Sequence, residues 1–172
     1  MIWRERWPGW MLLALASILS AILAHLALYV LPAVPGQEGM LMALSRAPLT
    51  LSVVQFAAAV TGAILLSGVG RMFGGRGLFP DALLAVGWAE IVMFVLQAGQ
   101  LALTAILPPL GALAGLAVLG LGIYLIVALT MAVHGFRNAF LVVLGIVGTI
   151  FVTGFLMSTA AAMLGLLSEV PA

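Results

Sequence analysis

The chain has 172 residues, of which 65% are apolar and 6% are charged, and its net charge is +1. A soluble domain averages roughly 45–50% apolar and 25% charged residues, so this composition excludes a water-soluble fold, a large aqueous catalytic domain and a basic face for nucleic acid. Cysteine is absent, which excludes disulfides and cysteine-ligated zinc.

Five apolar runs are long enough to cross a bilayer as helices. They cover residues 10–31, 49–70, 82–107, 110–133 and 139–167, and Pro32 and the Pro108–Pro109 pair follow the first and third runs. We therefore predict an all-α membrane protein in which residues 1–172 form a single transmembrane domain, a bundle of five helices. The loop after the first run contains residues 40–44, which we expect to form a short helix at the membrane surface. Short connections predict that the third, fourth and fifth helices are antiparallel neighbours.

Arginines fix the predicted orientation. With five spans, one side of the membrane receives Arg4, Arg6, Arg71, Arg76 and Arg137, and the other side receives only Arg46. The side richer in arginine is usually cytoplasmic. We therefore predict a cytoplasmic N-terminus and an outside C-terminus. All six cations are arginine, which together with abundant Ala, Gly, Leu and Val is typical of a GC-rich bacterial genome, and we predict an inner-membrane location.

The glycine-rich segment of residues 70–77 lacks the lysine and the Ser/Thr of a phosphate-binding loop, and no strand precedes it. We interpret it as a cytoplasmic turn. Its Arg71 and Arg76, together with Arg137, are predicted to form a patch that contacts anionic lipid headgroups.

Polar residues inside the spans are the other candidates. Glu90 lies roughly 12 Å from the cytoplasmic end of its helix, where an ionised carboxylate must be paired, protonated or hydrated. We expect Ser17, Thr61, Tyr124 and Thr149 at similar depth and a second layer of His25, Gln55, Gln97 and Thr153. The favoured interpretation is structural, with these groups hydrogen-bonded across helices. The alternative is a polar path for a proton or small solute.

No catalytic constellation is present, and His25 and His134 are predicted on opposite sides of the membrane midplane, which disfavours a metal site. We predict no enzymatic activity, no cofactor and no metal. Small residues at helix-packing intervals, such as the pairs Ala58/Gly62, Gly111/Gly115 and Gly145/Gly148, predict close contacts inside the bundle.

The second half of the chain resembles a known family. The segment of residues 74–89, GGRGLFPDALLAVGWA, followed by two apolar runs and then by residues 134–140, HGFRNAF, resembles the bacterial branch of the Yip family of five-span membrane proteins. Eukaryotic members interact with Rab-type GTPases. The resemblance implies a cytoplasmic N-terminus, an outside C-terminus and no enzymatic activity.

We expect a non-catalytic, membrane-organising or accessory subunit that acts through contacts with lipids, with itself or with another membrane complex. The alternative is a small transporter that uses Glu90 and the His25/Gln55/Gln97 layer.

Overall fold

The computed structural model describes residues 7–31 and 40–163. These form six helices and, within the same ranges, no strand: α1 (Trp7–Val30), α2 (Met40–Ser45), α3 (Pro48–Met72), α4 (Phe79–Ile106), α5 (Pro108–His134) and α6 (Ala139–Met163). Five of them are long and apolar enough to cross a membrane, and α2 is the short helix expected in the first loop. The chain is therefore an integral membrane protein of the predicted all-α class. Residues 164–167 of the predicted fifth span lie outside the described residues.

Local sequence signals explain where the helices begin and end. Proline occupies one of the first two positions of α3, α4 and α5, where its missing N–H costs no helical hydrogen bond. The carboxylate of Asp81 accepts a hydrogen bond from the Leu78 N–H at 3.3 Å before α4. The side-chain oxygen of Asn138 accepts from the first free N–H groups of α6, and Gly135 ends α5 in the left-handed conformation with φ of 73°.

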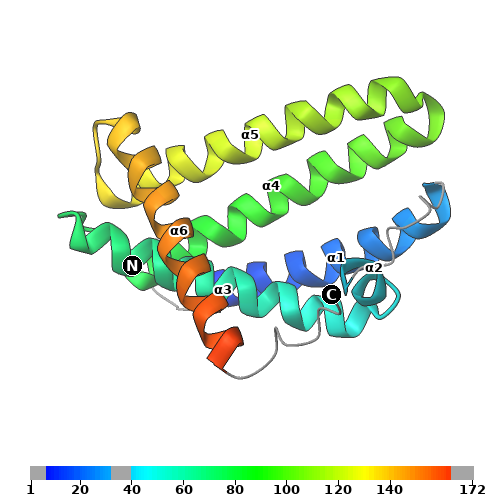
Figure 1. Ribbon diagram of the computed structural model, residues 1–172. Helices are drawn as coiled ribbons and strands as arrows, with labels where there is room; N and C mark the ends of the chain where they lie inside the picture. The colour runs from blue at the N-terminus through cyan, green and yellow to red at the C-terminus, as the bar shows by residue number, and fades with distance from the viewer. Residues whose placement is uncertain (1–6, 32–39, 164–172) are drawn as a thin grey trace.

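The helices alternate between two ends of the molecule (Figure 1). We call the end at which α3 and α5 finish and α4 and α6 begin the arginine end, because Arg71, Arg76 and Arg137 lie there. α1 begins near the same end and runs parallel to α4, since Gly9 lies against Leu83 and Gly87 lies against Leu12. α2 and Arg46 lie towards the opposite end, beside the last turns of α1.

A core of small and medium side chains joins α1, α3 and α4. It consists of Leu13, Ala59, Ala63, Ala82 and Leu83, each at most 9% exposed. Three alanines in this cluster let the helix backbones approach closely, which matters in lipid because association there depends on close packing. The core therefore fixes the three-helix part of the bundle.

Glycines pack α4 against α5. A Cβ atom at Gly111 would lie less than 3.0 Å from Thr104, and one at Gly115 would lie less than 3.0 Å from Gln100. The predicted packing role of Gly111 and Gly115 is confirmed, as is the antiparallel α4–α5 pair (Figure 1). The same prediction is wrong for Gly62 and Gly145, whose Cβ positions face open space.

α6 stands apart from the rest of the bundle. It contacts α5 near their connection and then crosses the other helices at a steep angle (Figure 1). Val142 is the one residue of α6 that is buried. The expectation that the last two spans are antiparallel neighbours thus holds only near the arginine end, and a Cβ atom at Gly145, Gly148 or Gly154 further along α6 would meet nothing within 4 Å.

Candidate functional site

His134 connects three segments at the arginine end. Its ring is 3% exposed and lies in the last turn of α5. The Gly77 N–H donates to Nδ1 over 3.2 Å, and Nε2 lies 2.9 Å from the carbonyl oxygen of Leu66 in α3. Because an amide N–H can only donate and a carbonyl can only accept, this network assigns the neutral ring with its proton on Nε2. We call this arrangement the histidine tie.

Glycine makes room for the imidazole. A Cβ atom on Gly70 or Gly75 would lie less than 3.0 Å from a ring nitrogen of His134, and one on Gly77 would approach Val133 and the same ring. The glycine-rich segment therefore closes around a histidine side chain. This supports its interpretation as a turn and explains its glycine content without a bound phosphate.

The tie also positions the backbone that carries two arginines. The Arg76 N–H donates to the His134 carbonyl oxygen over 3.4 Å. On the other side of the ring, Phe136 stacks on the imidazole with 5.3 Å between ring centroids, directly before Arg137. Two connections that are far apart in the sequence, residues 73–78 and 135–138, are thus held together by one side chain.

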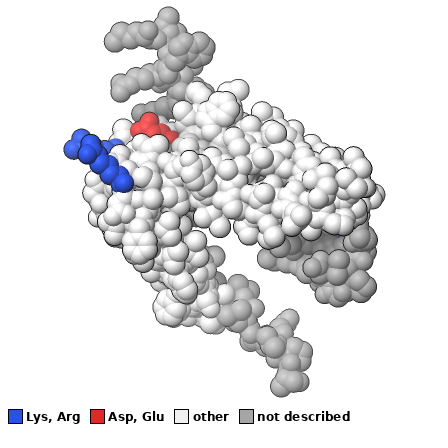
Figure 2. Space-filling model, turned by 90° about the horizontal axis from the view of Figure 1, so that it is seen from above, with Lys and Arg blue, Asp and Glu red and all other residues white. Residues whose placement is uncertain are grey.

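Arg71, Arg76 and Arg137 are all exposed. Figure 2 shows basic side chains gathered at one end of a surface that is otherwise almost uncharged. Arg46 follows α2 towards the opposite end, so the described arginines are segregated as predicted, three against one. Arg4 and Arg6 lie outside the described residues.

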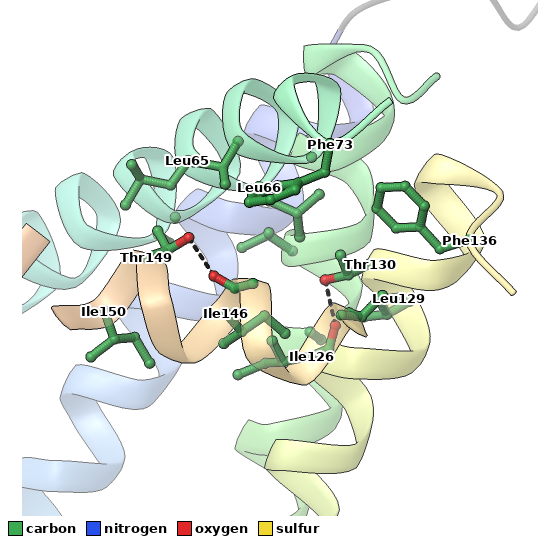
Figure 3. A pocket seen from close by; sticks show the side chains of 18 of the residues that line it. Leu65, Leu66, Phe73, Ile126, Leu129, Thr130, Phe136, Ile146, Thr149 and Ile150 are labelled. Atoms are coloured by element: carbon green, nitrogen blue, oxygen red, sulfur yellow. Dashed lines mark hydrogen bonds between the residues drawn. The ribbon is translucent and has the colours of Figure 1, made fainter. Parts of the chain in front are cut away.

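A cavity of about 970 Å³ extends from this end between α3, α4, α5 and α6. Its walls are mainly apolar. Figure 3 shows Leu65 of α3, Phe73 directly after α3, Leu129 of α5 and Ile146 and Ile150 of α6 around it. Arg137 and Asn138 line it where α6 begins. The cavity exists because α6 leaves the bundle after its first turns.

Among the candidate residues Glu90, His25, Gln55, Gln97 and Tyr124, three line this cavity: Glu90, Gln55 and Gln97. Thr149, predicted at the depth of Glu90, lines it too. Glu90 is half-buried, and within the described residues no cation or hydrogen-bond donor pairs with it. The Gln55 Oε1 is buried and has no hydrogen-bond partner in the described part of the chain. The cavity wall therefore has unpaired polar groups of the kind that a hydrated path would use.

The other two predicted residues lie elsewhere. His25 donates from Nδ1 to the Ser45 carbonyl oxygen over 2.9 Å and thereby attaches α1 to α2. Tyr124 is 66% exposed on α5 and does not line the cavity. The proposed His25/Gln55/Gln97 layer is thus divided, because helix-by-helix depth counting gives no information on which face each side chain occupies.

Hydroxyl groups do not link the helices as expected. Ser17, Thr61 and Thr149 each donate to the carbonyl four residues earlier in their own helix, at 2.7 to 2.8 Å. Because that carbonyl is always within reach, the hydroxyl bonds to it and not to a group on another helix when water is scarce. In the described part of the chain, the side chains of His134 and His25 do bond to other elements. Among residues 7–31 and 40–163, no three His, Cys, Asp or Glu side chains gather in a way that could hold a metal.

Comparison with known proteins identifies the family. The family model described as Yip1 domain matches residues 1–163. The chain belongs to the Yip1 domain family. The resemblance to the Yip family inferred from residues 74–89 and 134–140 is therefore confirmed at the level of the family. The structure brings parts of both segments together in the histidine tie. Searches of the curated proteins and of the solved structures give no match.

The structural role of His134 is not among the predictions from the sequence, where His134 enters as part of the segment 134–140 and as a disfavoured metal ligand. Two features of the sequence nevertheless indicate a structural role for this histidine. It lies between Val133 and Gly135, where an apolar span ends at a glycine, and the chain has a second glycine-rich turn at residues 70–77. A histidine at a helix end beside glycines is a good candidate for bonding to backbone groups.

Proposed function

We propose that this Yip1-domain protein is a non-catalytic, membrane-organising or accessory component that acts through its contacts with lipids and with other helices. The histidine tie is the observation that carries the proposal. A buried ring with both nitrogens bonded to backbone groups holds the two arginine-bearing connections in place. Such rigidity is expected of a surface that recognises something outside the bundle.

Anionic lipid headgroups are the proposed ligands of that surface. Arg71, Arg76 and Arg137 are exposed at the end of long apolar helices, where headgroups lie in a bilayer. Each arginine near an anionic surface contributes up to about 1 kcal/mol, and the attraction weakens as salt rises. A patch of three is enough to select lipids without any enclosed headgroup site.

The arginine end is proposed to face the cytoplasm, in the inner membrane of a bacterium. The positive-inside rule supports this orientation, because three of the four described arginines lie there. It places the N-terminus inside and the C-terminus outside.

Protein partners are the second part of the proposal. α6 buries one residue against its own bundle, and long apolar side chains such as Phe151 and Phe155 are more than 70% exposed. Some of this surface faces lipid, and the remainder is available to a second copy or to another membrane protein. The non-catalytic part rests on membership of the Yip1 domain family.

The test compares lipid selectivity in nanodiscs that contain equimolar phosphatidylglycerol and phosphatidylcholine. Spin-labelled forms of both lipids report which one is enriched in the shell around the protein. We expect the wild type to enrich phosphatidylglycerol, the R71A/R76A/R137A variant to lose that enrichment, and added salt to weaken it. R46A is the matched control at the opposite end and should change little on the arginine-end leaflet. Equal enrichment by the wild type and the triple variant would refute the proposal.

A second candidate function, solute or proton permeation, is favoured by one observation. Glu90 and Gln55 line the same cavity, and the Gln55 Oε1 is unpaired within the described residues. Proton or cation flux in proteoliposomes that disappears in Glu90→Gln would favour this candidate over the first.

A further inference from the structure

We propose that the cavity between α3 and α6 is a lateral binding site for one anionic glycerophospholipid, with its phosphate against Arg137 and one acyl chain along the cavity. This inference rests on the proposed lipid-organising function and specifies a discrete site for it. In addition to the surface patch of arginines, it specifies one phospholipid molecule bound in the cavity between the helices.

The cavity is long enough for an acyl chain. It is lined from Arg137 at the start of α6 to Gln97 in α4, and Gln97 lies about 27 Å beyond the start of α4 at about 1.5 Å per residue. Its volume is about 970 Å³. An extended hydrocarbon chain that enters beside Arg137 can therefore lie along it.

The chemistry of the walls also fits an acyl chain. Leu65, Leu129, Ile146 and Ile150 supply branched apolar surface along the cavity. Gln55, Glu90 and Gln97 also line the cavity, so its wall is mainly but not wholly apolar. The surrounding solvent of these helices is hydrocarbon. Lipid is therefore the occupant available in largest supply.

The end of the cavity carries the charge that selects the headgroup. Arg137 lines the cavity and is exposed, and within the described residues no carboxylate pairs with it. The stacked Phe136 and the Asn138 cap of α6 fix the backbone on either side of it. A guanidinium group presents parallel N–H donors that match two oxygens of a phosphate. Arg76, by contrast, does not line the cavity.

Glycines offer matched tests of this site. Gly62 in α3 and Gly145 in α6 both line the cavity, and a Cβ at either one meets nothing within 4 Å. Gly68 and Gly148, on the same two helices, are equally free of contacts but do not line it. Leucine at the first pair fills the cavity, whereas leucine at the second pair faces outwards.

The experiment uses the full-length protein from nanodiscs of equimolar phosphatidylglycerol and phosphatidylcholine, extracted in mild detergent. Native mass spectrometry counts the lipids that each chain retains. We expect the wild type to keep about one phosphatidylglycerol and G62L and G145L to retain roughly tenfold less, while G68L and G148L retain it as the wild type does. R137Q should lower the preference for phosphatidylglycerol about fivefold, and R76Q should not.

Several results would overturn the site. Two outcomes would show that lipids bind to a diffuse patch: G68L loses the lipid as much as G62L does, or R76Q and R137Q have equal effects. Either outcome would refute the discrete site and leave the proposed lipid-organising function intact. Circular dichroism and size-exclusion profiles check that each variant is folded. If G62L fails that check, G145L decides the question, and retained lipid in folded G145L refutes the proposal.

Discussion

Gly70→Ala is the most direct test of the histidine tie. The new Cβ would lie less than 3.0 Å from three atoms of the His134 ring, so the imidazole must leave its position. The bonds from Gly77 to Nδ1 and from Nε2 to Leu66 would then be lost. Gly77 is itself buried, and its N–H would have no acceptor.

The expected cost follows from these losses. An unpaired buried N–H costs about 1–3 kcal/mol, and the Nε2 bond to Leu66 adds about 0.5–1.5 kcal/mol. Alanine regains up to about 1 kcal/mol through its higher helix propensity. The net destabilisation should therefore lie between about 0.5 and 4.5 kcal/mol. Gly68→Ala, two residues earlier in α3 with open space at its Cβ, has only the favourable term and should be neutral or slightly stabilising.

Thermal unfolding in detergent, followed by size exclusion, measures both variants against the wild type. Gly70→Ala should melt several degrees lower than Gly68→Ala. His134→Ala should be at least as destabilised as Gly70→Ala, and combining the two should add little, because both remove the same bonds. Equal melting of the two glycine variants would refute the reasoning.

Three further predictions concern topology, the cavity wall and helix packing. Because the chain has no cysteine, Met72→Cys and Ala47→Cys report the two ends separately, and an impermeant maleimide added to intact bacterial cells should label only Ala47→Cys. Glu90→Gln should keep the fold, and Glu90→Leu should lower the free energy of unfolding by no more than about 1–2 kcal/mol, as judged by thermal melting. Loss of proteoliposome flux in a folded Glu90→Gln protein would instead support permeation. Gly111→Ala should destabilise the α4–α5 pair while Gly120→Ala, which faces open space, should not, and similar melting of the two would contradict the close contact with Thr104.

Hydropathy was sufficient to predict the helices but not their faces. The five predicted spans each match a helix, with ends that differ by a few residues, because Pro48, Pro80 and Pro108 begin helices where hydropathy alone sets no boundary. Which side chains share a cavity depends on the rotation of each helix about its axis. In helices that are apolar on all sides, no amphipathic stripe reveals that rotation. Depth alone therefore groups Tyr124 with Glu90 and His25 with Gln55, although the structure separates both pairs.

The separation of α6 could not be predicted either, and the reason bears on function. A soluble helix with this much apolar surface would be driven onto the bundle, but in lipid the hydrocarbon solvates it equally well. Contact then depends on close backbone approach, which α4 and α5 achieve at Gly111 and Gly115. A Cβ atom at Gly145, Gly148 or Gly154 of α6 would meet nothing within 4 Å, so the glycines of α6 make no such contact. The histidine tie holds the connection from α5 to α6 at the arginine end and leaves the rest of α6 without such a restraint. If a phospholipid occupies the cavity, it supplies the missing packing between α6 and α3, and α6 should become more resistant to proteolysis when phosphatidylglycerol replaces phosphatidylcholine in the nanodisc. Unchanged protection of α6 in the wild type would mean that the cavity is filled by whichever lipid surrounds it.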